Sequence, residues 1–199
     1  MPATTGMKGA GYYDQHSGAQ LSAIEALQDW VADAVARLPL PAPAQPVTVL
    51  ALLKHPEQMR RLRDDPALVR SAVEEGLRYD GAVILLQRIA REDLMLRGQT
   101  IRQGELLYLS LGAANRDPEM FSEPDRFDVG RSDNRHLAFG VGPHLCLGMT
   151  LARRELEVAL GRLVQRLPRL HFDGERPVRR RADSLLFRGL EALPVRFDS

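Results

Sequence analysis

The sequence has little cysteine, no long apolar run and almost no net charge, and each lack excludes a class of protein. Its 199 residues hold one cysteine, Cys146, which excludes an internal disulfide framework and a zinc site built from several cysteines. Lysine plus arginine total 27 and aspartate plus glutamate 26, so the basic excess typical of nucleic-acid-binding chains is missing. No stretch is apolar for the length of a membrane span or resembles a signal peptide core. These absences predict a cytoplasmic protein that binds neither nucleic acid nor membrane.

A cluster of prolines divides the chain into two parts. Apolar residues recur at helical spacing from Leu21 to Leu38, which predicts an amphipathic helix. Four prolines follow between Pro39 and Pro46, and a helix does not continue through such a stiff segment. We therefore predict an N-terminal part at 1–46, made of a loop, this helix and a proline strap, and one domain at 47–199.

The second part has the pattern of a mainly helical α+β domain. Apolar runs broken by Gly98 and Gly104 predict a small antiparallel sheet between residues 83 and 111. The tail after Pro168 alternates short strand-like pieces. Helical periodicity, prolines at first turns and one Asp cap predict helices at 47–54, 56–63, 66–79 and 147–167.

The single cysteine lies in a segment that can stabilise a thiolate. Residues 139–148 read Phe-Gly-Val-Gly-Pro-His-Leu-Cys-Leu-Gly, with Cys146 between a glycine-rich loop and a predicted helix. Amide groups and the dipole at a helix N-terminus favour a negative sulfur. One isolated thiolate suits one axial bond to a haem iron, whereas zinc needs more ligands.

This decapeptide resembles the haem-ligand loop of cytochrome P-450 proteins. Further stretches resemble that family in the expected order. Residues Glu75–Arg78 resemble its E-x-x-R helix, 124–127 resemble the later segment whose arginine completes that charge cluster, and 115–118 and 136–139 resemble bacterial members in particular. The similarity extends from about residue 47 to residue 197. Seven matching positions in ten, together with three companion segments in the expected order, are far more specific than one short motif.

The resemblance implies that the chain adopts the C-terminal portion of the cytochrome P-450 fold, with an amphipathic helix added at its N-terminus. It also implies that the cofactor is haem b. It implies that Cys146 binds the iron and that Phe139 packs near the haem ring. It also implies that glycines of the loop, Gly140 and Gly148 among them, shield the sulfur. Propionate groups would be held by Arg88, His136 and His144.

Other charged residues receive structural interpretations. Glu75 and Arg78, three residues apart on one helix, are expected to form a structural ion pair, and the resemblance implies that Arg126 completes this buried cluster. We interpret the arginines of the last helix as a solvated face, with docking of an acidic ferredoxin as the alternative. These arginines are Arg153, Arg154, Arg162 and Arg166.

The resemblance covers only part of a family member. Residues 47–54 resemble the last turns of the central helix on the distal side of the haem, and prolines stand where its proton-relay residues are expected. No catalytic residue is therefore assigned. An uncovered haem face would leave a large apolar surface in water, so we expect the 21–38 helix to fold over it. A partner chain or a second copy would serve equally well.

Three functions are compatible with these features. The first is a haem-thiolate oxidoreductase acting on a small organic substrate, as a monooxygenase supplied by a ferredoxin or driven by peroxide. The second is a haem-binding protein without oxygenase activity, such as a haem or gas sensor or a non-redox biosynthetic catalyst. The third is a haem-free interaction module, against which the joint presence of Arg88, His136, His144 and Cys146 argues.

Overall fold

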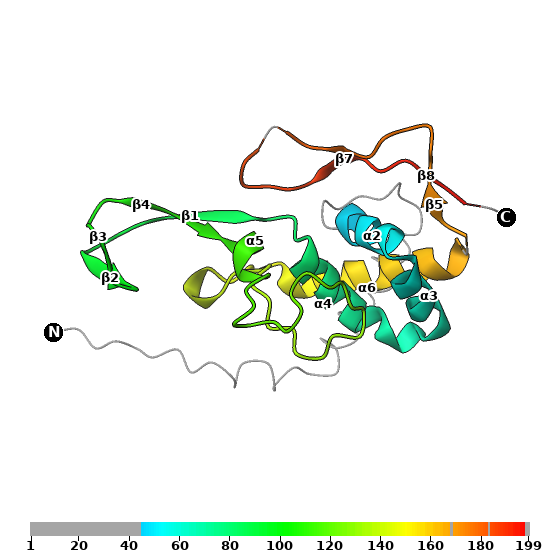
Figure 1. The fold of residues 1–199 in the computed structure, drawn as a ribbon, viewed down its shortest axis with the longest axis horizontal. Coiled ribbons are helices and arrows are strands. Elements are labelled where there is room, and N and C mark those ends of the chain that lie inside the picture. The colour runs from blue at the N-terminus through cyan, green and yellow to red at the C-terminus, as the bar shows by residue number, and fades with distance from the viewer. Residues whose placement is uncertain (1–44, 168, 183, 198–199) are drawn as a thin grey trace, which may run out of the picture.

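Within the part of the chain that the structure describes, four α-helices pack together at one end of the molecule (Figure 1). They are α2 (Gln45–Lys54), α3 (Pro56–Asp64), α4 (Val69–Tyr79) and α6 (Met149–Arg166), and a short 3-10 turn, η1 (Pro66–Leu68), precedes α4. The computed structural model describes residues 45–167, 169–182 and 184–197. The predicted helix at 21–38 and most of the proline strap lie outside these residues.

The sequence explains where the helices begin and which faces they bury. In α2 the residues from Val47 to Leu52 are all almost fully buried, as expected for a helix that is apolar on every side. Pro56 occupies the first turn of α3, and the Asp65 side chain accepts from the Ala67 amide at 3.1 Å at the start of η1. A Cβ atom on Gly76 would overlap Thr48, so glycine lets α2 and α4 cross closely.

A long antiparallel hairpin extends from the helical end. Strand β1 (Leu85–Ile89) pairs with β4 (Leu106–Ser110), and β2 (Leu94–Leu96) pairs with β3 (Gln99–Ile101) at the tip. Arg97 and Gly98 join β2 to β3 with φ angles of 46° and 80°, and two consecutive positive φ angles are typical of a tight hairpin turn. The predicted antiparallel sheet is confirmed as two nested two-stranded ladders.

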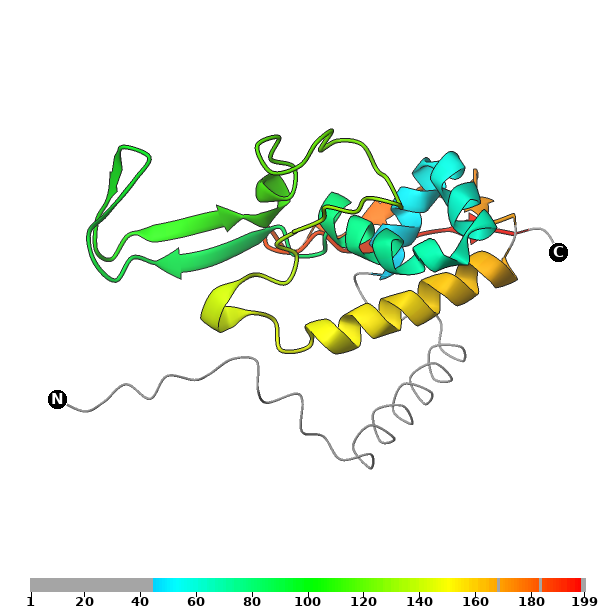
Figure 2. The same ribbon diagram turned by 90° about the horizontal axis from the view of Figure 1, so that it is seen from below.

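Short elements connect and cover these parts. Helix α5 (Leu111–Ala114) follows the hairpin directly, and the 3-10 turn η2 (Gly142–His144) lies just before α6. The tail forms β5 (His171–Phe172), β6 (Arg179–Arg180), β7 (Leu190–Ala192) and β8 (Val195–Arg196), which pair as β5–β8 and β6–β7. Figure 2 shows the hairpin, the loop of η2 and α6 meeting at the middle of the molecule. The predicted mainly helical α+β class is confirmed.

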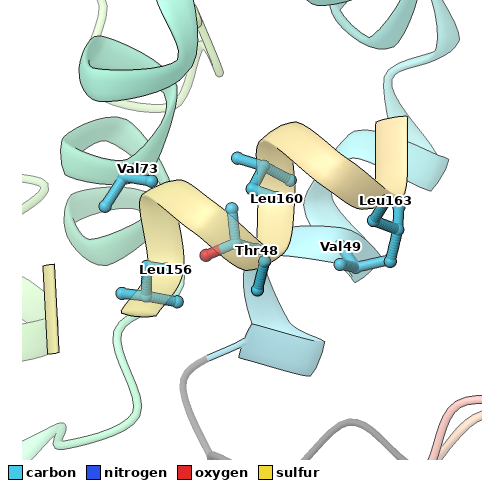
Figure 3. A pocket seen from close by; sticks show the side chains of 7 residues that line it. Thr48, Val49, Val73, Leu156, Leu160 and Leu163 are labelled. Atoms are coloured by element: carbon cyan, nitrogen blue, oxygen red, sulfur yellow. The ribbon is translucent and has the colours of Figure 1, made fainter. Parts of the chain in front are cut away.

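The helical end contains a small apolar cavity, which Figure 3 shows between α2, α4 and α6. Its lining includes Thr48, Val73, Leu156 and Leu160, and its volume is about 10 Å³. A space of this size holds at most about one water molecule. The cavity is therefore a packing defect in the core, and a ligand site has to be sought elsewhere.

Candidate functional site

A pocket of about 400 Å³ opens where the hairpin base meets the cysteine loop. The end of α4, strand β1, the start of α5 and the segment before α6 all contribute to it. Its walls are mostly apolar. Among the described residues that line it, the polar side chains are those of Arg88, His144 and Cys146. The lining residues are Leu77, Ala82, Val83, Leu86, Arg88, Leu111, Ala138, Phe139, Gly140, His144 and Cys146.

Two glycines shape the loop that carries the cysteine. Gly140 and Gly142 have φ angles of 73° and 78°, a region that residues with a side chain rarely adopt. The loop then turns back, so that the Cys146 amide donates to the Phe139 carbonyl at 3.0 Å. Cys146 is a free, exposed cysteine that lines the pocket. The predicted helix begins at Met149 instead of residue 147, which leaves Cys146 just before its first turn.

Arg88 and His144 both line this pocket. Arg88 lies on β1 and its Nη1 donates to the Gln87 carbonyl at 2.7 Å, while His144 ends the η2 turn two residues before Cys146. The structure therefore brings together two of the three predicted propionate partners and the predicted iron ligand. That these side chains bind haem stays a prediction.

His136 lies away from the described pocket lining, with both ring nitrogens engaged. The Ala138 amide donates to its Nδ1 at 3.1 Å, and its Nε2 lies 3.0 Å from Glu74 Oε2. Because Nδ1 accepts from the Ala138 amide, Nε2 is the ring nitrogen that can donate to Glu74. The side chain is only 2% exposed, and that His136 binds a propionate stays a prediction.

Glu74 is the partner that sequence reasoning missed. Arg153 holds it from α6 with two hydrogen bonds, Nε to Oε1 at 2.7 Å and Nη2 to Oε2 at 2.9 Å. Burial by itself raises the pKa of Glu74, but the hydrogen bonds and charges of His136 and Arg153 outweigh it and lower the pKa to about 2. Arg153 therefore belongs to an ion pair, which corrects its assignment to a solvated face.

The predicted pair of Glu75 and Arg78 is confirmed, but its third member is wrong. Arg78 donates to both carboxylate oxygens of Glu75, at 2.7 and 2.9 Å, and both side chains are fully buried. Arg131 completes the cluster, with its Nε 3.1 Å from Glu75 Oε2. The side chain of Arg126 points outward to Glu123 at 2.8 Å, and only its carbonyl accepts from Arg78.

The remaining predicted residues divide into two groups. Phe139 and Gly140 line the pocket beside Cys146. Gly148 caps the N-terminus of α6, and a Cβ atom added there meets no atom of the described chain within 4 Å. Its role beside a cofactor stays a prediction. The described pocket lining contains no acidic or hydroxyl side chain, so no proton-relay residue can be assigned there.

The residues that the structure describes contain no helix long and apolar enough to cross a membrane. They also contain no group of three or more histidine, cysteine, aspartate or glutamate side chains placed to hold a metal ion.

Comparisons with known proteins converge on one family. Residues 47–187 match the family model described as cytochrome P-450. A biotin biosynthesis cytochrome P-450 of Bacillus subtilis is 51% identical over 155 residues, which cover 76% of this chain and 38% of the relative. A 20-oxo-5-O-mycaminosyltylactone 23-monooxygenase of Streptomyces fradiae is 49% identical over 150 residues, covering 75% of this chain and 36% of the relative. The chain thus spans less than two fifths of the length of these relatives.

Solved structures give the same result. P-450 BioI in complex with acyl carrier protein ligated to hexadec-9Z-enoic acid shares 49% identity, with a TM-score of 0.75 over 78% of this chain and 40% of that one. A Bacillus megaterium cytochrome P-450 in complex with testosterone shares 34% identity, with a TM-score of 0.77 over 79% of this chain and 40% of that one.

Proposed function

The chain belongs to the cytochrome P-450 family, and from that premise we propose that it forms the cysteine side of a haem pocket in an oxidoreductase that acts on a small apolar substrate. Members of this family bind haem b through a cysteine thiolate. The observation that carries the proposal is the convergence of Cys146, Arg88 and His144 on one apolar pocket.

The chemistry of the pocket fits a haem. Its apolar walls suit the flat porphyrin, and the Cys146 sulfur suits the single axial position on the iron. Arg88 and His144 provide donors for two propionate groups, which as partly buried anions need charged or hydrogen-bonded partners. When bound, haem with a thiolate ligand supplies oxygen chemistry in which cleavage of the O–O bond is favoured.

The chain's own residues would position the reactants. Val83, Leu86 and Leu111 exclude water from one side of the pocket and give an apolar substrate a surface to pack against. One relative is named for 20-oxo-5-O-mycaminosyltylactone, and two are solved with hexadec-9Z-enoic acid ligated acyl carrier protein and with testosterone. An apolar small organic molecule is therefore the substrate class that we propose.

The exposed apolar side chains around Cys146 require a cover. Val141 is 72% exposed, Leu145 44%, Leu151 47%, and Leu147 is fully exposed. Folded proteins seldom leave such a patch in water. The 21–38 helix, a partner chain and a second copy remain the predicted covers.

Arg162 and Arg166 lie exposed on α6 and could receive an acidic ferredoxin in the cytoplasm, the predicted compartment.

A second candidate function is haem binding without oxygenation. It is favoured by the described pocket lining, which contains no acidic or hydroxyl side chain to deliver protons. Such a protein would bind haem and a gas at the same pocket as a sensor, or would catalyse a reaction without electron transfer.

Turnover distinguishes the two functions. We expect the haem-loaded chain to convert hexadec-9-enoic acid and hydrogen peroxide into a hydroxylated acid and water, because peroxide brings oxygen that is already reduced and needs no added electrons. Mass spectrometry detects the added oxygen atom, and a parallel reaction uses a ferredoxin, its reductase and molecular oxygen. Haem-loaded protein that yields no product in either reaction would support the sensor function instead.

A further inference from the structure

A charge cluster ties the cysteine loop to two helices. Glu74 from α4 binds Arg153 from α6 through two hydrogen bonds and lies 3.0 Å from Nε2 of His136, which precedes the loop. His136 and Arg153 follow Glu74 by 62 and 79 positions in the sequence. Figures 1 and 2 both show α4 beside the first half of α6, where this cluster lies.

The geometry of this cluster differs from that of the ordinary surface pairs on the same helix. Arg154, the next residue along α6, binds Glu157 of its own helix through one hydrogen bond of 3.2 Å and is 41% exposed. Arg153 binds a residue of another helix at both carboxylate oxygens, and the His136 side chain beside them is almost fully buried. Burial of a polar ring is costly unless its nitrogens are bonded, and here both are.

Both partners of Glu74 contact the same aromatic ring. The Arg153 guanidinium lies over the Phe139 ring, with Cζ 4.7 Å from its centroid. The His136 and Phe139 ring centroids are 6.2 Å apart. These distances are typical of cation–π and aromatic contacts. Glu74 therefore fixes two side chains that together hold Phe139.

Phe139 in turn carries the hydrogen bond that closes the cysteine loop. Its carbonyl accepts from the Cys146 amide at 3.0 Å, and both residues line the same pocket. We propose that Glu74 is a positioning residue that acts through Arg153, His136 and Phe139 to set the place of the Cys146 sulfur. The proposal rests on the proposed haem function and gives His136 a role other than propionate binding.

Hydrogen exchange in the chain without haem tests the positioning step directly. We expect Glu74→Gln to lower the protection of the Cys146 amide about tenfold, because the ring that holds its acceptor is loosened. The amide of Leu160, in the buried core of α6, should keep its protection. If Glu74 had a purely structural role, Glu74→Gln would lower the protection of both amides in parallel. That result would overturn the proposal.

A second pair of variants guards against unfolding and against nonspecific charge effects. Arg153→Lys keeps the positive charge but loses the planar group over Phe139. It should therefore lower the exchange protection of the Cys146 amide in the same way as Glu74→Gln. Glu119→Gln removes the exposed Arg97–Glu119 pair, whose atoms are 3.3 Å apart, and should leave the Cys146 amide unchanged. If Glu119→Gln lowered the exchange protection of the Cys146 amide as much as Glu74→Gln does, that result would contradict the proposal.

Haem-loaded protein adds a spectroscopic measurement. In the reduced carbon monoxide complex, we expect Glu74→Gln to lower the fraction with a thiolate-type Soret band by roughly threefold relative to the unmodified chain, while Glu119→Gln keeps it. An unchanged fraction in Glu74→Gln would contradict the proposal. If the unmodified chain bound no haem, the proposed function would fail, and the exchange measurement would still decide the positioning role.

Discussion

Replacing Arg78 with alanine should remove a large part of the free energy of unfolding of the chain. Its guanidinium binds both oxygens of Glu75 and the carbonyls of Asn115, Pro124 and Arg126, all within 3.1 Å, and it is fully buried. Removing one partner from a buried cluster of this kind costs about 3–5 kcal/mol. Since small domains are stable by about 5–15 kcal/mol, such a loss is a large part of the total.

Arg126→Ala is the matched control for this prediction. The Arg126 side chain is 55% exposed and pairs with Glu123 on the surface, and alanine keeps the carbonyl that accepts from Arg78. We expect it to change the free energy of unfolding far less than Arg78→Ala does, because exposed ion pairs contribute little to stability. Urea titrations followed by circular dichroism measure both variants. If both variants lost the same free energy of unfolding, that result would mean that Arg126, not Arg131, completes the cluster.

Acid should destabilise the chain through Glu74. Its pKa is lowered from 4.5 to about 2, because hydrogen bonds from His136 and Arg153 outweigh the opposing effect of burial. A carboxyl whose pKa is lower in the folded state adds stability that is complete above the unfolded value and is lost as pH falls through the folded one. For Glu74 that window lies between about pH 4.5 and pH 2, and the stability at stake is on the order of 2–3 kcal/mol.

Unfolding of the Glu74→Gln variant across pH isolates this contribution. At pH 6 the variant should be less stable than the unmodified chain, and the difference should shrink toward zero near pH 2. Asp128 and Asp173 also have a lowered pKa. For Asp128, burial raises the pKa, but hydrogen bonds from the Gly130 amide and from Arg61 outweigh it. For Asp173, the hydrogen bond from Arg176 is the main cause. Their contributions are present in both proteins and cancel in the comparison. A difference that stays constant with pH would contradict the assignment.

Local patterns in the sequence predicted most of the fold, because helix ends and turns depend on nearby residues. Pro56 and Asp65 mark the starts of α3 and η1, and the glycine at position 98 marks the hairpin turn. The cysteine loop was equally visible, since its glycines, histidine and cysteine are contiguous. The third strand of the hairpin, β3, was missed because its three residues carry little apolar pattern.

The charge clusters could be predicted only in part, because their partners are far apart in sequence. Glu74 and Glu75 are adjacent on α4, and successive helical side chains point in different directions, so each joins a different cluster. Nothing in local spacing indicates that Arg153, 79 residues later, reaches the first of them. Likewise, Arg131 reaches Glu75 only because the chain turns back at Gly130, whose amide donates to Asp128 at 2.9 Å.

The most direct test of the haem-thiolate site is the absorption spectrum of the haem-loaded, reduced chain under carbon monoxide, beside a Cys146→Ala variant. If Cys146 is the iron ligand, the unmodified chain shows a strongly red-shifted Soret band, and the variant loses that band while Arg88 and His144 still bind the propionates. The same band in both proteins, or a histidine-type band in the unmodified chain, would contradict the assignment of Cys146.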